Sequence, residues 1–161
     1  MIVTFKWNEL QANHSIKWKA FHEVIERMYS TLASSSSDSN DENIHSVLFF
    51  IRESHVQGCL MVERVHSSLV YPIDKSSLDN PLPPSTTSSI PSSSYKMGVR
   101  FIWVNEFARR RRTASLLVDA ARMTFLLTAV GKADVAFSQP TSDGLKFAFA
   151  YAEKDRILVY K

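Results

Sequence analysis

The sequence has a single cysteine, Cys59, among its 161 residues. It therefore cannot form an intramolecular disulfide or a zinc site built from several cysteines, and we expect a reducing compartment, the cytosol or the nucleus. Its four glycines stand in neither a GxxxxGKS/T nor a GxGxxG pattern, and no GxSxG is present. Two phosphate-binding loops and the serine-hydrolase elbow are thus excluded as motifs. The five histidines form no HxH or HxxxH pair, so the sequence predicts no metal site.

Long apolar runs are also missing. No stretch approaches the roughly 18 uninterrupted apolar residues of a membrane helix, and no secretory signal is visible at the N-terminus. The composition, 45% hydrophobic and 22% charged, is typical of a soluble globular protein. Residues 1–95 carry 7 basic and 10 acidic side chains, whereas residues 96–161 carry 12 and 6. A basic C-terminal half favours a negatively charged partner, and nucleic acid, an acidic protein surface and a phosphorylated cofactor all fit.

Two polar segments interrupt the chain. Residues 34–41 are mostly serine, aspartate and asparagine, and residues 76–94 hold eight serines and four of the six prolines. Neither segment can bury enough apolar area to offset the entropy of ordering, so we expect mobile loops at 34–41 and 72–97. Because each flank is too small to fold alone, we expect one domain over residues 1–161 rather than two.

Hydrophobic spacing predicts a mixed α/β fold. Apolar residues three and four positions apart predict helices over 18–32 and 113–127, and a third helix can begin at 141–144. Short runs rich in β-branched and aromatic residues predict strands, of which the first two form a hairpin. The expected strands are Val47–Ile51, Val56–Val65, Val99–Val104, Ala133–Phe137 and Ile157–Tyr160.

A basic turn joins one of these strands to the helix over 113–127. Four arginines, Arg109–Arg112, precede the small residues Ala114 and Ser115 at the expected helix start. Free N–H groups and the positive end of the helix dipole make such a start an anion site, and a pyrophosphate is a natural occupant. Small side chains let the backbone approach, and arginines can clamp the phosphates. A nuclear-localisation or nucleic-acid patch on a solvated surface explains the same run equally well.

Four segments carry a family resemblance. They are Gly58–Glu63 (GCLMVE), Gly98–Val104 (GVRFIWV), the turn with Arg109, Arg112, Ala114 and Ser115, and Ala136–Gly144 (AFSQPTSDG). In this order they resemble the catalytic domain of the sister-chromatid cohesion acetyltransferases, over residues 47–160. These relatives have the GNAT fold, a mixed central sheet flanked by helices, and acetylate lysines on the SMC ATPase subunit of cohesin. They usually carry an upstream zinc finger that this sequence lacks, so we expect an isolated catalytic domain.

The resemblance implies acetyl-CoA as the cofactor. Backbone groups of the Ile102–Val104 strand would then face the pantetheine arm, and the turn that follows would cradle the pyrophosphate. Where other GNAT enzymes prefer glycine, this chain has Arg112, which is a mild departure. The cofactor-binding residues implied in this way are Ile102, Trp103, Val104, Arg110, Arg111, Arg112, Thr113, Ala114, Ser115, Thr141, Ser142 and Asp143.

Two further departures concern acid–base chemistry. Some relatives have serine where this chain has Arg100, and a catalytic aspartate where it has Gln139. A lysine amine of pKa ~10.4 is neutral in only about one molecule per 2,500 at pH 7, so a base must remove its proton. Gln139 cannot accept that proton but can orient a water or the lysine. Glu63 is the best remaining carboxylate, and a solvent-facing strand residue is its competing interpretation.

The sequence therefore leads to one functional hypothesis with two alternatives. The hypothesis is a nuclear, chromatin-associated protein-lysine N-acetyltransferase that uses acetyl-CoA, with Glu63 and Gln139 as catalytic residues and the cohesin SMC subunit as substrate. One alternative is a GNAT enzyme that acylates another amine. The second is a basic chromatin-binding module with weak catalysis, which Arg100 and Gln139 favour. We expect no membrane partner, and direct binding to nucleic acid stays open.

Overall fold

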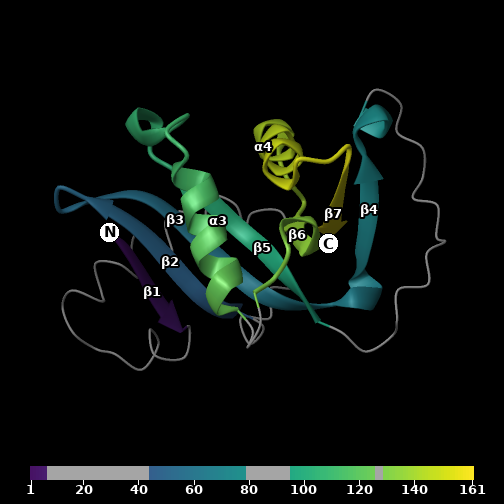
Figure 1. Cartoon of the computed structure of the whole chain (residues 1–161), viewed down its shortest axis with the longest axis horizontal. Helices are drawn as coiled ribbons and strands as arrows, with labels where there is room; N and C mark the ends of the chain where they lie inside the picture. The colour runs from purple at the N-terminus through teal and green to yellow at the C-terminus, as the bar shows by residue number, and fades with distance from the viewer. Residues whose placement is uncertain (7–43, 79–94, 126–128) are drawn as a thin grey trace.

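Seven strands and two long helices make up the described part of the chain (Figure 1). The computed structural model describes residues 1–6, 44–78, 95–125 and 129–161. The helices are α3 (Thr113–Thr124) and α4 (Ser142–Ala152). The strands are β1 (Ile2–Lys6), β2 (Ile44–Arg52), β3 (His55–His66), β4 (Val70–Asp74), β5 (Tyr95–Val104), β6 (Val135–Ser138) and β7 (Arg156–Tyr160).

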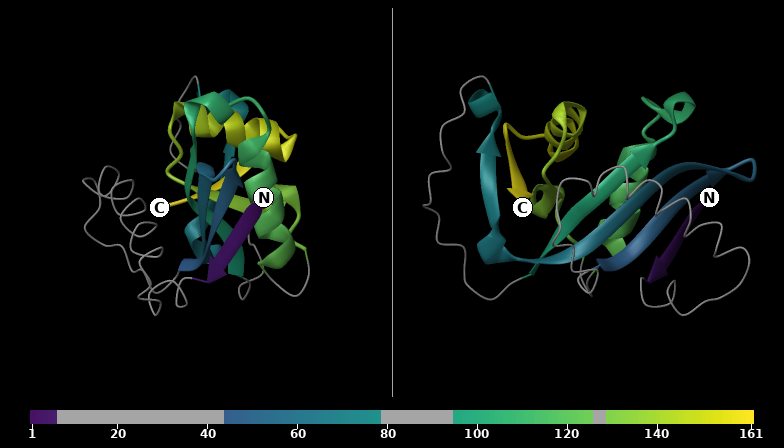
Figure 2. Two further views of the ribbon diagram at one scale, coloured as in Figure 1. Left: turned by 90° about the vertical axis from the view of Figure 1, so that its left-hand side faces the viewer. Right: turned by 180° about the vertical axis from the view of Figure 1, so that it is seen from behind.

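The strands form one mixed sheet in the order β1-β2-β3-β5-β6-β7-β4. β5, β6 and β7 run parallel to one another, and the other neighbours pair antiparallel. Both helices lie on the same face of this sheet, as Figures 1 and 2 show. The expected mixed α/β architecture is therefore confirmed. No helix in the described part of the chain is long and apolar enough to span a membrane.

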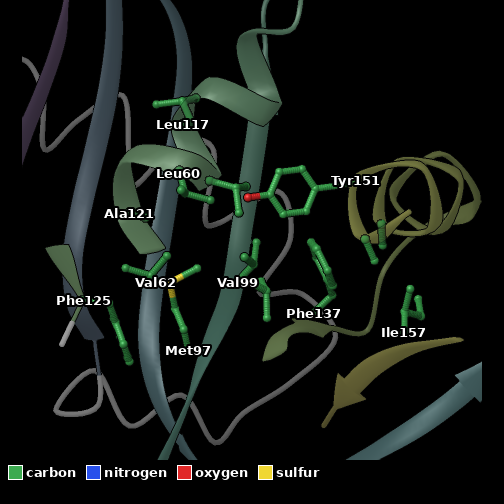
Figure 3. Packing of buried hydrophobic residues seen from close by; sticks show 14 of the residues in the cluster. Leu60, Val62, Met97, Val99, Leu117, Ala121, Phe125, Phe137, Tyr151 and Ile157 are labelled. Atoms are coloured by element: carbon green, nitrogen blue, oxygen red, sulfur yellow. The ribbon is translucent and has the colours of Figure 1, made fainter. Parts of the chain in front are cut away.

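The main core fills the space between the sheet and the two helices (Figure 3). Leu117 and Ala121 of α3 point down onto Leu60 and Met97 of the central strands. Because side chains alternate along a strand, the intervening residues face the other side of the sheet. Two smaller clusters cover that side: Val47, Phe49, Cys59 and Met61 with Phe101 and Trp103, and Val65, Val70, Ala136 and Tyr160 with Leu158.

The central strands β5 and β6 part from each other halfway along β5. Their pairing covers only Met97–Val99 and Val135–Phe137. Beyond that point β5 stays bound to β3, whereas the chain of β6 turns away into α4. The opening between them lies beside the start of α3, and it is this divergence that makes room for a site.

The strands and helices expected within the described residues are confirmed, with two additions. β1 and β4 were not expected, and each pairs antiparallel at an end of the sheet. As an edge strand, β4 tolerates Pro72, whose missing N–H would weaken a central strand. The expected loop at 72–97 is wrong at both ends, because residues 72–74 belong to β4 and 95–97 to β5. The expected helix over 18–32 and the loop at 34–41 lie outside the described residues.

Candidate functional site

A cleft of about 1680 Å³ opens where β5 and β6 part. The second half of β5 and the start of α3 form one wall, and the turn from β6 into α4 forms the other. β3 and β7 contribute its deepest polar groups, Glu63 and Tyr160. The cleft thus joins the basic turn before α3 to a buried carboxylate.

The start of α3 is open to an anion. Arg112 is its N-cap residue and provides no side-chain cap to the helix N–H groups. Arg110 and Arg112 both adopt left-handed backbone conformations, with φ of 60° and 64°, which are costly for residues other than glycine. Successive N–H groups in such a turn form an anion-binding concavity, and the helix dipole adds positive potential. This geometry also explains why GNAT enzymes prefer glycine at the position of Arg112.

Two contacts fix this turn, one within it and one to the end of β5. The Thr113 hydroxyl, on a buried residue, donates a hydrogen bond to the Ala108 carbonyl at 3.1 Å. Arg109 Nε donates to the Val104 carbonyl at 3.2 Å. On β3, a Cβ at Gly58 would stand 3.1 Å from Thr113 Cγ2 and 3.2 Å from the Trp103 carbonyl oxygen. Glycine at this position lets the helix start lie close to the strands that line the cleft.

The start of α4 is built differently. The Thr141 hydroxyl oxygen accepts a hydrogen bond from the Gly144 N–H at 3.2 Å, so the helix caps itself. Asp143 lies in the first turn, and its carboxylate is 3.6 Å from Lys146 Nζ. A carboxylate there already complements the helix dipole. The chain thus satisfies this helix start with its own groups.

Glu63 is buried, not solvent-facing, with 7% of its surface exposed. One carboxylate oxygen accepts a hydrogen bond from the Tyr160 hydroxyl at 2.8 Å, and the other from an Arg100 guanidinium nitrogen at 2.9 Å. Burial and the adjacent Glu63 carboxylate raise the pKa of Tyr160, and the positive charge of Arg100 partly opposes that rise. Residues from β3, β5 and β7 therefore meet in one polar chain of Arg100, Glu63 and Tyr160, and Ser138 of β6 lies beside Tyr160 as its strand partner.

Two local features bring Arg100 and Tyr160 to this carboxylate. Arg100 is the extra residue of a β-bulge, because Met61 pairs with Phe101 and Val62 with Val99. A bulge redirects a side chain at a site, which is a common use of bulges. Gly98 leaves room for the phenol, since a Cβ there would stand 2.7 Å from the Tyr160 hydroxyl oxygen.

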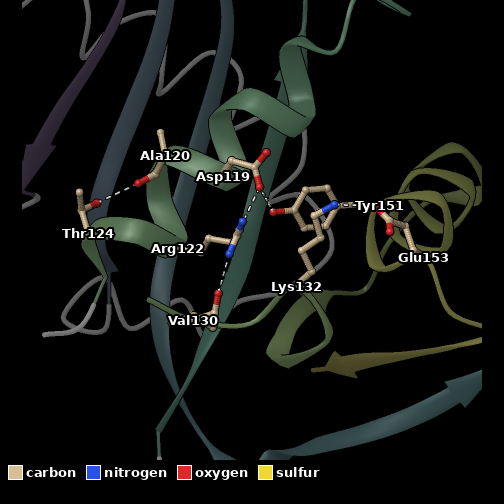
Figure 4. Close-up of polar contacts among 8 residues, drawn as sticks. All are labelled: Asp119, Ala120, Arg122, Thr124, Val130, Lys132, Tyr151 and Glu153. Atoms are coloured by element: carbon tan, nitrogen blue, oxygen red, sulfur yellow. Dashed lines mark hydrogen bonds and ion pairs between the residues drawn. The ribbon is translucent and has the colours of Figure 1, made fainter. Parts of the chain in front are cut away.

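A polar cluster ties α3 to α4 (Figure 4). Asp119 accepts hydrogen bonds from the Tyr151 hydroxyl at 2.7 Å and from Arg122 Nε at 2.9 Å. Arg122 also donates to the Val130 carbonyl at 3.0 Å. Burial and the bond to Asp119 raise the pKa of Tyr151, so its hydroxyl stays a donor. The cluster fixes the relative positions of the helices whose N-termini flank the cleft.

Most of the residues implied by the family resemblance border this cleft. Trp103 does not, because its side chain packs against Cys59 and Met61 on the sheet face away from the helices. Arg111 and Ser142 are not among the lining residues either. Those that line it are Glu63, Ile102, Val104, Arg110, Arg112, Thr113, Ala114, Ser115, Gln139, Thr141 and Asp143.

Sequence reasoning missed Tyr160 and Ser138 as site residues. Ser138 stands inside the segment Ala136–Gly144 that carries the resemblance, and Tyr160 ends a strand that was expected. The signal that could have found them is strand alternation, which puts Ala136 and Ser138 on one face. Within the described residues no group of histidine, cysteine, aspartate and glutamate side chains could hold a metal ion.

Comparison with known proteins gives one consistent family. A profile described as ESCO1/2 acetyl-transferase matches residues 93–160. Human N-acetyltransferase ESCO2 is 36% identical over 124 residues, which cover 73% of this chain and 20% of that protein. N-acetyltransferase eso1 of Schizosaccharomyces pombe is 28% identical over 134 residues, 80% of this chain and 15% of that protein. The chain therefore spans about a fifth or less of these relatives.

Two solved structures share the fold. The xEco2 acetyltransferase domain bound to a K105-CoA conjugate has a TM-score of 0.74 and 27% identity, covering 99% of this chain and 92% of that one. A second structure of the xEco2 acetyltransferase domain has a TM-score of 0.71 and 26% identity, covering 99% and 89%. Whole-chain similarity of fold thus accompanies the local matches in sequence.

Proposed function

The chain belongs to the family of ESCO1/2 acetyltransferases, and on this premise we propose that it is an acetyl-CoA-dependent protein-lysine N-acetyltransferase. One observation carries the proposal: the open, arginine-bounded start of α3 and the buried Glu63 border the same cleft. The first suits a pyrophosphate and the second suits removal of a proton, which are the two demands of this reaction.

The residues of the cleft fit acetyl-CoA. The left-handed backbone at Arg110 and Arg112 supports this fit, because turns of this kind form the anion-binding concavities that suit a pyrophosphate. The same two side chains line the cleft and can clamp phosphate oxygens. Ile102 and Val104 of β5 border the opening, where the strand edge is no longer paired with β6. When bound, acetyl-CoA supplies an acyl group activated as a thioester.

The chain's own groups have to prepare the lysine. Only the neutral amine attacks an acyl group, so the ammonium must lose a proton inside the site. Glu63 is the candidate final acceptor, and Gln139, at the turn after β6, is suited to orient the amine or a water. Arg100 keeps the carboxylate in place through its 2.9 Å ion pair.

For the substrate, we propose a lysine of the SMC ATPase subunit of cohesin, with a role in sister-chromatid cohesion and a place in the nucleus. Family membership supports this substrate class, as does the relative whose structure holds a lysine–CoA conjugate. The net positive charge of the second half of the chain is compatible with a protein that acts near the negatively charged DNA of chromatin.

Thermal unfolding with added acetyl-CoA tests the cofactor. A ligand that binds only the native state stabilises it by about 2.7 kcal/mol at 100 times its dissociation constant. Acetyl-CoA should therefore raise the melting temperature, while acetyl-pantetheine, which lacks the pyrophosphate, should raise it much less. No shift at millimolar acetyl-CoA would contradict the proposal.

Mass spectrometry of acetylated products then tests the substrate. The protein is incubated with acetyl-CoA and either a purified cohesin SMC ATPase head or a mixture of small amines. We expect acetyl-lysine on the SMC head. Acetylation of small amines alone would favour a different GNAT enzyme, and cofactor binding without any transfer would favour a chromatin-binding module.

A further inference from the structure

Glu63 borders the cleft, but little of it is open to a substrate amine. Only 7% of its surface is exposed, and both carboxylate oxygens are already hydrogen-bonded. Arg100 occupies one oxygen and Tyr160 the other, at 2.9 Å and 2.8 Å. Each oxygen keeps a second lone pair, but the small exposed surface gives an amine little room to reach it directly. A buried base in this arrangement has to receive its proton through a neighbour.

Tyr160 is the neighbour that can deliver it. Its hydroxyl donates to Glu63, and Ser138 is its partner residue across β6 and β7, so the two residues lie side by side and both line the cleft. Arg100, in contrast, stays charged and offers no acceptor for an incoming proton. Because burial and the Glu63 carboxylate raise the pKa of Tyr160, the phenol keeps its proton at physiological pH. It is therefore always present as a donor to the carboxylate.

Ser138 stands at the other end of this chain of hydroxyls, where the cleft opens. It is the last residue of β6, beyond the last pair that β6 forms with β5, and it is only partly buried. It pairs with Tyr160 across β6 and β7, and the next residue, Gln139, donates its N–H to the Tyr160 carbonyl at 3.3 Å. The backbone thus ties the turn after β6 to Tyr160 and keeps Ser138 beside it.

We propose that the hydroxyls of Ser138 and Tyr160 relay the substrate's proton to Glu63. The step rests on the proposed acetyltransferase function. The substrate ammonium gives a proton to the Ser138 oxygen, Ser138 gives its own to the Tyr160 oxygen, and Tyr160 gives its own to Glu63. The amine and the Glu63 carboxyl both end neutral, and each hydroxyl has lost one proton and gained one. In the described residues, the charged or titratable groups that contact Glu63 are Arg100 from β5 and Tyr160 from β7.

Removing one hydroxyl tests the relay. Tyr160→Phe keeps the ring but breaks the chain, so we expect kcat to fall at least about 100-fold, the lower range of general-base contributions. Binding of acetyl-CoA, measured by thermal shift, should stay within about threefold, because the pyrophosphate site is at the start of α3. Tyr71→Phe, on β4 and outside the cleft, is the matched control and should keep wild-type kcat.

A second pair of variants tests the same step without touching the core. Ser138→Ala should lose kcat as Tyr160→Phe does, and Ser138→Thr, which restores a hydroxyl, should recover most of it. The pH dependence and the solvent deuterium isotope effect of kcat give the readouts that a structural role would not move. Two hydroxyls that move protons in one step predict a curved dependence of rate on deuterium fraction in wild type.

The outcomes separate the relay from the function it serves. If Tyr160→Phe folds and keeps kcat within threefold, Glu63 is not reached through Tyr160 and the relay is wrong. A fully active Ser138→Ala would overturn the relay at its first hydroxyl, including when Tyr160→Phe fails to fold. If wild type itself binds acetyl-CoA but acetylates nothing, the proposed function is wrong, and the relay that rests on it is wrong as well.

Discussion

Two helices begin at the same cleft, and their N-termini are prepared in opposite ways. α4 is capped by its own Thr141 and carries Asp143 in its first turn. α3 has no side-chain cap, no acidic residue in its first turn, and an arginine at its N-cap position. Both starts border the cleft, so the contrast is not one of location.

The contrast indicates which helix start is reserved for a ligand. A self-capped start has less to gain from an anion, because a hydroxyl and a carboxylate already complement its N–H groups and dipole. A start without such groups keeps its binding capacity, and the left-handed residues Arg110 and Arg112 hold it open at a cost in backbone energy. We therefore assign the pyrophosphate to the start of α3. We infer that Thr141 serves mainly to cap α4.

The largest effect should come from reversing charge at α3. The double variant Arg110→Glu with Arg112→Glu places negative charge against both the helix dipole and the ligand. The affinity for acetyl-CoA should therefore fall by more than about tenfold, which is a loss of more than about 1.4 kcal/mol of binding free energy. Isothermal calorimetry measures the affinity, and circular dichroism confirms the fold.

Arg111→Glu is the matched control for this variant. It reverses one arginine of the same run where the double variant reverses two, and Arg111 does not line the cleft, so the loss should be several times smaller than half of the double variant's loss in free energy. If the double variant kept its affinity while binding to DNA or nuclear import fell, the arginines would form a surface patch instead, and the assignment to α3 would be wrong.

Removing the cap of α4 should act on stability instead of binding. Thr141→Ala should lower the free energy of unfolding by about 1 kcal/mol, the usual value of an N-cap, with affinity for acetyl-CoA almost unchanged. Urea unfolding measures the first and calorimetry the second. Thr141→Ser, which restores the hydroxyl, should regain most of the stability. A large loss of affinity in Thr141→Ala would make this residue part of the cofactor site, as the family resemblance implies.

The smallest effect should come from Asp143→Asn. The exposed carboxylate contributes to α4 only through the dipole and a 3.6 Å ion pair with Lys146, so the free energy of unfolding should fall by a few tenths of a kcal/mol. Denaturant midpoints in low and high salt would separate this electrostatic loss from others. A change in the KM for acetyl-CoA larger than threefold would show that Asp143 contacts the cofactor, and the two helix starts would then differ less than we infer.

Local patterns in the sequence account for much of the fold. The alternation in β3 and the spacing of Leu117 and Ala121 in α3 depend on neighbours along the chain, and both elements were predicted. β1 and β4 were not predicted, because each has only five residues and too short a pattern to show a strand by itself. Each is defined by pairing with a distant strand, residues 46–50 for β1 and 156–160 for β4. Pro72 also made β4 hard to predict, because a proline argues against a strand unless the strand is known to lie at the edge of a sheet.

What the sequence alone determined about the site is the arginine-bounded start of α3, to which we assign the pyrophosphate. A strand, a run of arginines and a helix with small first residues follow one another along the chain, so the physics of a helix start could be applied directly. Only the tertiary structure decided the state of Glu63. Its partners, Arg100 and Tyr160, stand 37 and 97 residues away, and they reach it through a bulge in β5 and the return of β7 to the sheet. Burial and pairing of a carboxylate depend on such distant strands meeting, which no local pattern encodes.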